Sequence, residues 1–251
     1  MIEFVKTKDG SPTIYDPETG EHHHSLIGSY TEARYKFAEV ARSIIQKKSR
    51  INLLDLPFGL GYNLIATLDV LREVENTSKK DNGNSVKQKF LECVAVEKDR
   101  KVIEAIGYYP WQEPLKGKFV QLKNVLNEGN QIEAKDFSLN LIIDDLLLVL
   151  PKIHQSFDLI FYDPFSPKTS PDLWSREKVL KFFYELLAPG GLLITYTASN
   201  KVRKGLQEVG FYIAPSVAVG RKMPGTIASK EPLEASFSEE TFEKIQKASS
   251  Y

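Results

Sequence analysis

The chain has 251 residues, of which 42% are hydrophobic and 26% are charged, a composition typical of a soluble globular protein. Its 33 basic and 33 acidic residues give a net charge of +0, which excludes a general electrostatic attraction to nucleic acid, so any RNA contact needs a local basic patch. No apolar run reaches membrane-spanning length and no signal peptide is visible, so we expect a cytoplasmic protein that binds no membrane.

Residues 1–48 are expected to form an N-terminal extension made of a hairpin and a helix. Residues 2–6 and 12–15 are short β-prone runs on either side of Asp9-Gly10, which is a hairpin signal. The adjacent His22, His23 and His24 follow; neighbours in sequence point to different sides and no His-x-x-x-His spacing exists, so we predict no metal site and leave their role open. Residues 31–45 have the apolar spacing of a helix, with Thr31 as a candidate N-cap.

Residues 51–63 are the stretch around which the rest of the chain is organised. Residues 51–56 form an apolar run typical of a buried parallel strand, and Pro57 ends it because proline cannot donate to a strand ladder. Gly59 and Gly61 follow, and residues 63–71 then place leucines on one helical face. Strand, glycine turn and helix let the backbone approach a nucleotide-like ligand. The third glycine of a dinucleotide fingerprint is missing, so the turn alone also fits a plain strand-to-helix connection.

An acidic residue on the next strand strengthens the interpretation of the glycine turn as part of a site for a nucleotide-like ligand. Residues 73–89 are polar and predict a surface loop, after which residues 91–97 form a strand that ends at Glu97. A carboxylate at that position can accept hydrogen bonds from both ribose hydroxyls. Together, the glycine turn and Glu97 indicate a class I methyltransferase that uses S-adenosyl-L-methionine as its cofactor.

Strands and helices alternate along the rest of the chain. Predicted strands cover residues 137–143, 157–163, 192–197, 211–214 and 226–229, and predicted helices cover 98–108, 115–127, 146–153, 175–187 and 201–209. This alternation predicts an α/β fold of the Rossmann-like, class I methyltransferase type, with a mostly parallel seven-stranded sheet. We expect the methyltransferase domain over residues 49–231 and a C-terminal tail over 232–251, with a polar helix after Ser238.

Four positions converge at the carboxyl ends of the predicted strands, where ligands bind in such sheets. They are Gly59, Glu97, Asp145 and Asp163. Acidic residues also occur in loops by chance, but the convergence favours a functional site.

Several segments resemble the methyltransferase half of the MnmC family. They are Tyr-Asp-Pro-Phe-Ser-Pro at 162–167, Pro-Asp-Leu-Trp at 171–174, Leu-Ala-Pro-Gly-Gly-Leu at 187–192, residues 202–211, Gly-Arg-Lys at 220–222, Asp-Gly-Ser-Pro-Thr at 9–13 and Glu-Ala-Arg-Tyr at 32–35. The resemblance runs in order from about residue 7 to residue 229. Pro57, Leu60 and Tyr62 depart from the family's usual glycine loop, and Pro164 replaces a small residue.

The resemblance implies methylation of the exocyclic amine of 5-aminomethyl(-2-thio)uridine at the tRNA wobble position, giving the 5-methylaminomethyl product. It implies tRNA, through its anticodon loop, as the partner, and a functional link to an enzyme that forms the aminomethyl group. Many members carry a fused FAD-dependent oxidase; this chain has no second glycine fingerprint, so it resembles a free-standing methyltransferase.

The expected site residues fall into three groups. Asp163 is the catalytic candidate, because a carboxylate at the end of the central strand can orient an amine and remove its proton; a turn cap is the alternative. The expected cofactor-binding residues are Asp55, Phe58, Gly59, Gly61, Asn63, Glu97 and Asp145, with Asp144 as the alternative to Asp145 for adenine. The expected substrate-binding residues are Phe165, Lys168, Arg203, Lys204, Arg221 and Lys222, the cations as phosphate contacts.

Three other functions compete with this interpretation. A spermidine-synthase-like aminopropyltransferase shares the fold and the acid on the fourth strand, although residues 171–174 and 220–222 argue against it. A small-amine methyltransferase is a close variant. A non-catalytic RNA-binding module of the same fold is the third, and cofactor binding separates it from the others.

Overall fold

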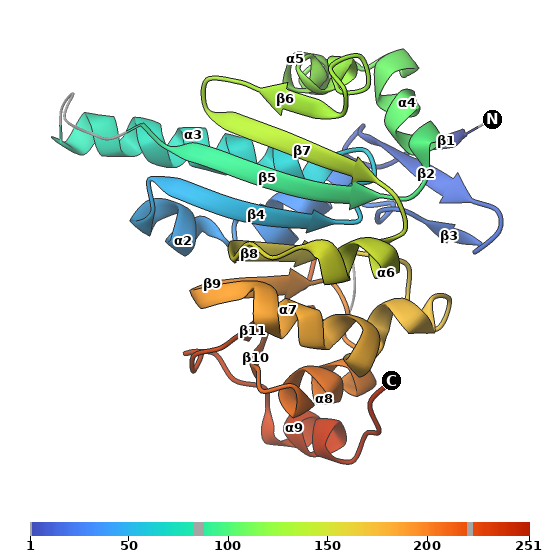
Figure 1. Ribbon diagram of the computed structural model, residues 1–251, viewed down its shortest axis with the longest axis vertical. Coiled ribbons are helices and arrows are strands. Elements are labelled where there is room, and N and C mark those ends of the chain that lie inside the picture. Colours follow the sequence, from blue (N-terminus) through green and yellow to red (C-terminus); the bar gives the residue numbers. More distant parts are fainter. Residues whose placement is uncertain (1, 83–87, 220–222) are drawn as a thin grey trace.

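The computed structural model describes residues 2–82, 88–219 and 223–251. Its centre is an eight-stranded sheet of order β10-β11-β9-β8-β4-β5-β7-β6 (Figure 1). The strands are β4 (Arg50–Leu56), β5 (Phe90–Glu97), β6 (Gln131–Glu133), β7 (Phe137–Ile143), β8 (Phe157–Tyr162), β9 (Leu187–Thr195), β10 (Tyr212–Pro215) and β11 (Thr226–Ser229). The five strands β7, β5, β4, β8 and β9 pair in parallel, and β6, β10 and β11 pair antiparallel at the two sides. The predicted class I fold is confirmed, with β6 as an additional edge strand.

Helices cover both faces of this sheet. They are α1 (Ser29–Glu32), a π-helical segment (Ala33–Ala38), α2 (Arg42–Lys47), α3 (Tyr62–Asn82), α4 (Arg100–Tyr108), α5 (Leu115–Phe119), α6 (Leu146–Val149), a second π-helical segment (Arg176–Leu180), α7 (Lys181–Leu186), α8 (Asn200–Glu208) and α9 (Glu239–Gln246). Short 3₁₀ segments lie at Leu122–Asn124, Leu150–Lys152 and Pro171–Trp174.

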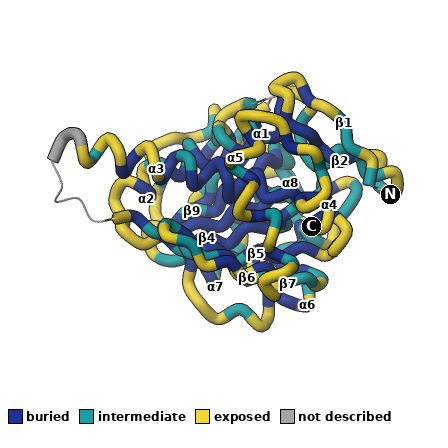
Figure 2. The backbone as a smooth tube through the Cα atoms, turned by 90° about the horizontal axis from the view of Figure 1, so that it is seen from above, coloured by how far each residue is buried: buried dark blue, intermediate teal, exposed yellow. Residues whose placement is uncertain are grey.

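Alternating side chains of the strands enter two separate hydrophobic cores. Leu53 and Phe161 pack with α3 and α4, whereas Leu54 and Ile160 pack with α7 and α8 on the other face. Successive residues of a strand point to opposite faces, so an apolar strand can serve both cores at once. Figure 2 shows the result, with β4, β5 and β9 buried inside a more exposed shell.

A small antiparallel sheet lies beyond the carboxyl ends of the central strands (Figure 1). It consists of β1 (Glu3–Lys6), β2 (Pro12–Asp16) and β3 (Glu21–His22), and β1 pairs with β2 as the hairpin signal predicted. The Glu21 carboxylate accepts hydrogen bonds from the Ser166 amide at 3.1 Å and the Ser166 hydroxyl at 2.6 Å. The N-terminal sheet is therefore tied to the loop that follows β8.

The prediction of a loop over residues 73–89 was wrong for its first part, because α3 continues to Asn82. Glu73 accepts from Arg34 at 2.7 Å and from Arg42 at 2.8 Å, and Lys79 donates to Glu75 one turn away at 2.5 Å. Such pairs support a polar, solvent-facing helix, and its composition resembles that of a loop. Residues 83–87 lie outside the described part of the chain.

The helix predicted over residues 31–45 begins earlier, at Ser29, with Gly28 in the N-cap position instead of Thr31. The polar helix predicted after Ser238 is present as α9, and the Ser238 hydroxyl caps it by accepting the Thr241 amide. The tail packs on α8, where Ser250 donates to Glu208 at 2.7 Å. The boundaries proposed after residues 48 and 231 stay a prediction. No helix in the described residues is long and apolar enough to span a membrane.

Candidate active site

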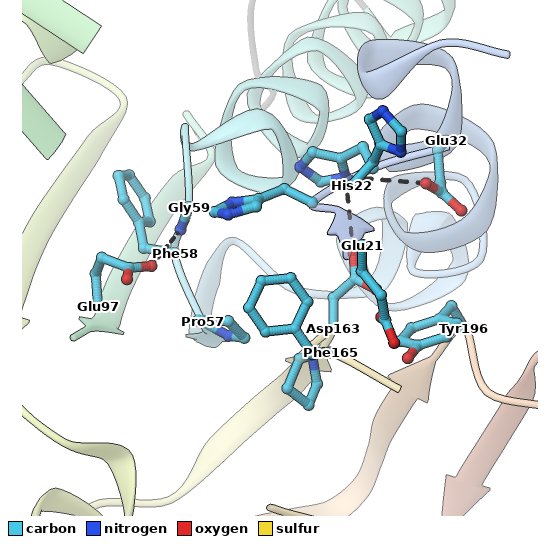
Figure 3. Close-up of a pocket in the computed structure, with 13 residues that line it drawn as sticks. Glu21, His22, Glu32, Pro57, Phe58, Gly59, Glu97, Asp163, Phe165 and Tyr196 are labelled. Atoms are coloured by element: carbon cyan, nitrogen blue, oxygen red, sulfur yellow. Dashed lines mark hydrogen bonds and ion pairs between the residues drawn. The ribbon is translucent and has the colours of Figure 1, made fainter. Parts of the chain in front are cut away.

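Two adjoining cavities open at the carboxyl ends of the central strands, and Pro57, Glu97, Pro164 and Phe165 line both of them. The first, which we call the histidine cavity, is drawn in Figure 3. Its other lining residues are Glu21, His22, His23, His24, Glu32, Phe58, Gly59, Asp163 and Tyr196. The second, which we call the α6 cavity, is also lined by Val96, Lys98, Asp144, Asp145, Leu146, Leu147, Thr169, Ser170, Pro171, Asp172 and Leu173. The structure therefore brings Gly59, Glu97, Asp145 and Asp163 to one end of the sheet, as the sequence predicts.

The turn after β4 needs both of its glycines. Gly59 has φ +56° and Gly61 has φ +81°, in the left-handed region that favours glycine. A side chain at Gly61 would place its Cβ 2.8 Å from the Phe58 ring and 2.9 Å from Leu122. At Gly59 no atom lies within 4 Å of an added Cβ, so this backbone faces open space. The turn is shaped to bring backbone close to a ligand.

Glu97 sits where the two cavities meet. Its carboxylate accepts the Gly59 amide at 2.9 Å and the Asp99 amide at 3.0 Å. Burial raises the pKa of this carboxyl above its ordinary value, against the effect of the two amides. Its position next to the glycine turn is the one expected of a ribose acceptor.

Asp55 and Asn63 lie beneath the turn and line neither cavity. The Asn63 side-chain amide donates to Asp55 at 3.2 Å, and both side chains are buried. Burial raises the pKa of Asp55 to about 8, although the Asn63 bond opposes this. The structure thus shows these two expected cofactor residues joining the end of β4 to the start of α3, where they support the turn from below.

Asp145 caps α6 and accepts the Leu147 amide at 2.9 Å. The Lys98 ammonium donates to the same carboxylate at 2.8 Å, and this bond holds the pKa of Asp145 below its usual value. Asp144 lines the same cavity, so both acids remain candidates for the adenine contact.

Asp163 directly follows β8, and its amide donates to the Leu56 carbonyl at 2.7 Å. Its side chain is 9% exposed, and one carboxylate oxygen lies 3.8 Å from Nδ1 of His24. Phe165 lines the cavity beside it, and the indole N–H of the buried Trp174 donates to the Phe165 carbonyl at 2.9 Å. The Pro-Asp-Leu-Trp segment therefore anchors the loop that carries Phe165.

Eight lining residues of the histidine cavity were not predicted as site residues. They are Pro57 and Pro164, and six with ionisable side chains: Glu21, His22, His23, His24, Glu32 and Tyr196. Glu32 accepts from Lys36 at 2.5 Å, and both side chains are buried. A signal existed in the sequence, because Glu32 and Lys36 lie one turn apart on the same helical face as apolar residues, the pattern of a buried ion pair. The histidines were noticed only as metal candidates. No cluster of three or more ligating side chains suited to a metal occurs in the described ranges.

The predicted phosphate contacts are not gathered at the cavities. Arg203 is 1% exposed and donates to the Thr226 hydroxyl at 3.0 Å and the Pro224 carbonyl at 3.0 Å. Its expected contact with RNA phosphate conflicts with this burial, because the guanidinium is used to join α8 to the strand β11. Lys204 donates to Gln246 of α9 at 3.3 Å. Lys168 is exposed on the loop after β8, and Arg221 and Lys222 lie outside the described residues.

Residues 110–231 match the model of a family described as S-adenosyl-L-methionine-dependent methyltransferase. The crystal structure of MNMC2 from Aquifex aeolicus superposes with a TM-score of 0.82 at 28% sequence identity, covering 99% of this chain and 76% of that one. The chain has the fold of an S-adenosyl-L-methionine-dependent methyltransferase, and over residues 110–231 its sequence matches that family. It also resembles larger proteins.

Among its relatives, an uncharacterized protein of Methanocaldococcus jannaschii is 29% identical over 91% of this chain and 60% of its own length. The tRNA 5-methylaminomethyl-2-thiouridine biosynthesis bifunctional protein MnmC of Campylobacter hominis is 28% identical over 89% of this chain and 31% of its own. The methyltransferase thus spans less than two thirds of the first of these relatives and about a third of the second.

The residues at the cavities fit the cofactor. An open backbone at Gly59, a carboxylate at Glu97 and the polar and apolar groups beside α6 offer partners to its amino acid, ribose and adenine parts in turn. When bound, S-adenosyl-L-methionine supplies an electrophilic methyl group on a sulfonium, and the chain's own residues must orient the acceptor and manage its proton.

Proposed function

We propose that this methyltransferase modifies the exocyclic amine of 5-aminomethyl(-2-thio)uridine at the wobble position of tRNA, in the cytoplasm. The product is the 5-methylaminomethyl nucleoside. An enzyme that installs the aminomethyl group has to act before it. The names of the MnmC relatives support this substrate.

The observation that carries the proposal is the charge of the histidine cavity. Glu21, Glu32, Glu97 and Asp163 line it, and its described lining includes no lysine or arginine. A cavity lined by carboxylates favours a cationic group. An alkylamine is protonated at neutral pH, with a pKa near that of lysine, about 10.4, so it enters such a space as an ammonium ion.

Asp163 is placed to act on that ammonium. It lies at the end of β8, in the same cavity as Gly59 and Glu97, which belong to the proposed cofactor side. A carboxylate there accepts a hydrogen bond from the ammonium and orients its nitrogen. Methyl transfer then depends mainly on alignment, because the sulfonium methyl is already activated.

The aromatic residues at the cavity suit an unpaired base. His23 and Phe165 meet edge to face with ring centroids 5.3 Å apart, and both line the histidine cavity. A wobble base lies in a single-stranded loop, so it can leave the stack at lower cost than a base in a duplex. We therefore place the uracil ring against Phe165.

Mass spectrometry of wobble nucleosides tests the proposal. Undermodified tRNA that carries 5-aminomethyl-2-thiouridine is incubated with the protein and S-adenosyl-L-methionine. We expect a gain of one methyl group on that nucleoside alone. Free putrescine with decarboxylated cofactor is the comparison arm, and aminopropyl transfer in that arm without tRNA methylation would overturn the proposal.

The remaining candidate cations can be tested by salt dependence. We expect the double variant Arg221→Ala, Lys222→Ala to flatten the plot of log affinity for tRNA against log salt by about one to two units. Arg50→Ala with Lys47→Ala is the matched control, since Arg50 begins β4 and Lys47 ends α2, which precedes that strand. Equal slopes for all three proteins would mean that residues 221 and 222 do not contact phosphate.

A further inference from the structure

We propose that His24 is a positioning residue that completes the proton path of the site: Asp163 hands to Nδ1 of His24 the proton that the substrate ammonium gives up, and Glu32 holds the imidazole in place. This inference rests on the proposed function and adds to it the destination of the proton. It assigns a role to the one histidine of residues 22–24 that faces two carboxylates.

The geometry around His24 carries the inference. Nδ1 is buried without a hydrogen-bond partner, yet it lies 3.8 Å from an Asp163 oxygen and 3.9 Å from a Glu32 oxygen (Figure 3). Buried polar atoms are nearly always paired, and an exception calls for an explanation. A nitrogen aimed between two carboxylates, a few tenths of an ångström beyond hydrogen-bond distance, is suited to receive a proton from one of them.

The imidazole ring itself is held firmly. The His24 amide donates to the Thr13 hydroxyl at 2.9 Å, and the ring meets Tyr62 edge to face at 5.4 Å. Glu32 is held in turn by Lys36 at 2.5 Å and by the Ser25 amide at 2.8 Å. A small movement of Asp163 on substrate binding is therefore enough to bring its oxygen to Nδ1.

Burial and the surrounding charges keep the imidazole of His24 neutral before the proton transfer. They are the carboxylates of Glu32, Asp163 and Asp9 and the ammonium of Lys36. Burial lowers the pKa of His24, and Lys36 lowers it further, while Glu32 and Asp9 oppose them. The net effect is a lowered pKa, so the imidazole is uncharged at neutral pH. The proposed path uses the tautomer with its proton on Nε2, which leaves the lone pair of Nδ1 to accept a proton.

The proton balance is as follows. The substrate ammonium loses one proton to Asp163 and keeps the electron pair on nitrogen. Asp163 passes that proton to Nδ1 and returns to its carboxylate form, leaving an imidazolium beside Glu32. The amine lone pair forms the new C–N bond to the methyl carbon while the C–S electrons stay on sulfur. The methylated ammonium leaves, and the imidazolium then loses its proton to water that refills the cavity.

Single-turnover methylation measured from about pH 5 to about pH 9 tests the path. His24→Asn keeps a nitrogen or oxygen near the Nδ1 position but cannot take up a proton. We expect its rate at neutral pH to fall about tenfold or more, and the acid limb of the wild-type profile to move in the variant. The matched control is His154→Asn, an exposed histidine ahead of β8, which should keep both rate and profile. A His24→Asn variant with the wild-type rate and profile overturns the inference.

A second measurement does not depend on turnover or on the folding of that variant. Nitrogen NMR of histidine-labelled protein follows protonation of His24 in the wild type and in Asp163→Asn. Loss of the neighbouring charge should lower the pKa of His24, and an unchanged titration overturns the inference. A wild type that does not methylate the tRNA would refute the proposed function instead, while the NMR comparison would still decide whether His24 and Asp163 are coupled.

Discussion

The histidine cavity and the α6 cavity meet at Glu97, but they differ in whether their surroundings stabilise the charged or the neutral form of an ionisable side chain. In the α6 cavity, Asp145 is paired with an ammonium at 2.8 Å and its pKa is lowered, so it is ionised at neutral pH. In the histidine cavity, burial lowers the pKa of His24. Fixed charges hold a ligand, whereas groups that burial pushes toward neutrality can exchange protons. The difference separates a part of the site that binds from a part that reacts.

The largest effect is expected for Asp163→Asn, which tests whether the histidine cavity carries the reaction. The substitution removes the proposed proton acceptor without changing its shape. We expect turnover to fall about 10²- to 10⁴-fold, with cofactor affinity changed by less than about twofold. Initial rates and calorimetry measure the two quantities. Asp136→Asn, which affects a surface pair with Arg72, serves as the control. A variant that keeps most of the wild-type rate would show that Asp163 only supports its loop.

The next largest effect is expected at the junction, with Glu97→Gln. The amide can still accept from Gly59, so the turn should persist, but the charge-assisted bonds to ribose are lost. Such bonds contribute about 1.5–3 kcal/mol each, so we expect cofactor affinity to fall about 10- to 100-fold. Glu92→Gln on the same strand, in an exposed pair with Arg50, is the control. Unchanged affinity in a folded Glu97→Gln protein would remove Glu97 from the cofactor site.

A smaller effect is expected in the α6 cavity. The Lys98 partner of Asp145 is 76% exposed, and solvent-exposed ion pairs contribute about 0–1 kcal/mol. We therefore expect Asp145→Asn to weaken cofactor binding less than about fivefold, because the amide oxygen still accepts a hydrogen bond. Calorimetry on Asp144→Asn beside it decides which acid contacts adenine: the one whose loss costs more affinity.

Asp55 extends the comparison from ligand binding to stability. Its folded pKa of about 8 lies above the ordinary 3.8, so the folded state holds a proton that the unfolded state has released, and stability is lost as pH rises through that window. We expect the wild-type Tm to fall between about pH 5 and about pH 8, and Asp55→Asn to reduce that fall by about 7–14 °C. Calorimetric melting at both pH values measures it. Parallel pH dependence in the two proteins would contradict a buried, protonated Asp55.

Local patterns were sufficient to predict the fold and to bring Gly59, Glu97 and Asp145 to one end of the sheet. An apolar run before Gly59 and an acid ending the next strand locate these groups, because parallel strands end at one edge of a sheet. The prediction ended α3 too early, because the second half of this helix is polar. The ion pairs of Glu73 with Arg34 and Arg42 support the helix, but these partners are distant in sequence and cannot be recognised from the local pattern.

The surroundings of Asp163 were harder to predict, because they include residues of the N-terminal segment. His24, which lies near Glu32, comes close to Asp163 where this segment packs on the loop after β8 through Glu21, and no spacing along the chain encodes that contact. Arg203 was expected at the surface but is buried. A basic residue at a helix start suggests a surface charge, yet the turn before β11 supplies carbonyls that hold it inside.

The tie between Glu21 and the Ser166 loop has a consequence for how such enzymes can diversify. Glu21, His24 and Glu32 lie within the first 32 residues, whereas Gly59, Glu97 and Asp145 lie at or just after the carboxyl ends of later strands. Under the proposed function, selectivity for the methyl acceptor is encoded apart from affinity for the methyl donor. Exchange of the N-terminal segment between homologues, with the matching Ser166 contacts, is a route to new acceptors that leaves the donor platform intact. Substitutions that accumulate in that segment would change which methyl acceptor is used before they change the affinity for the methyl donor.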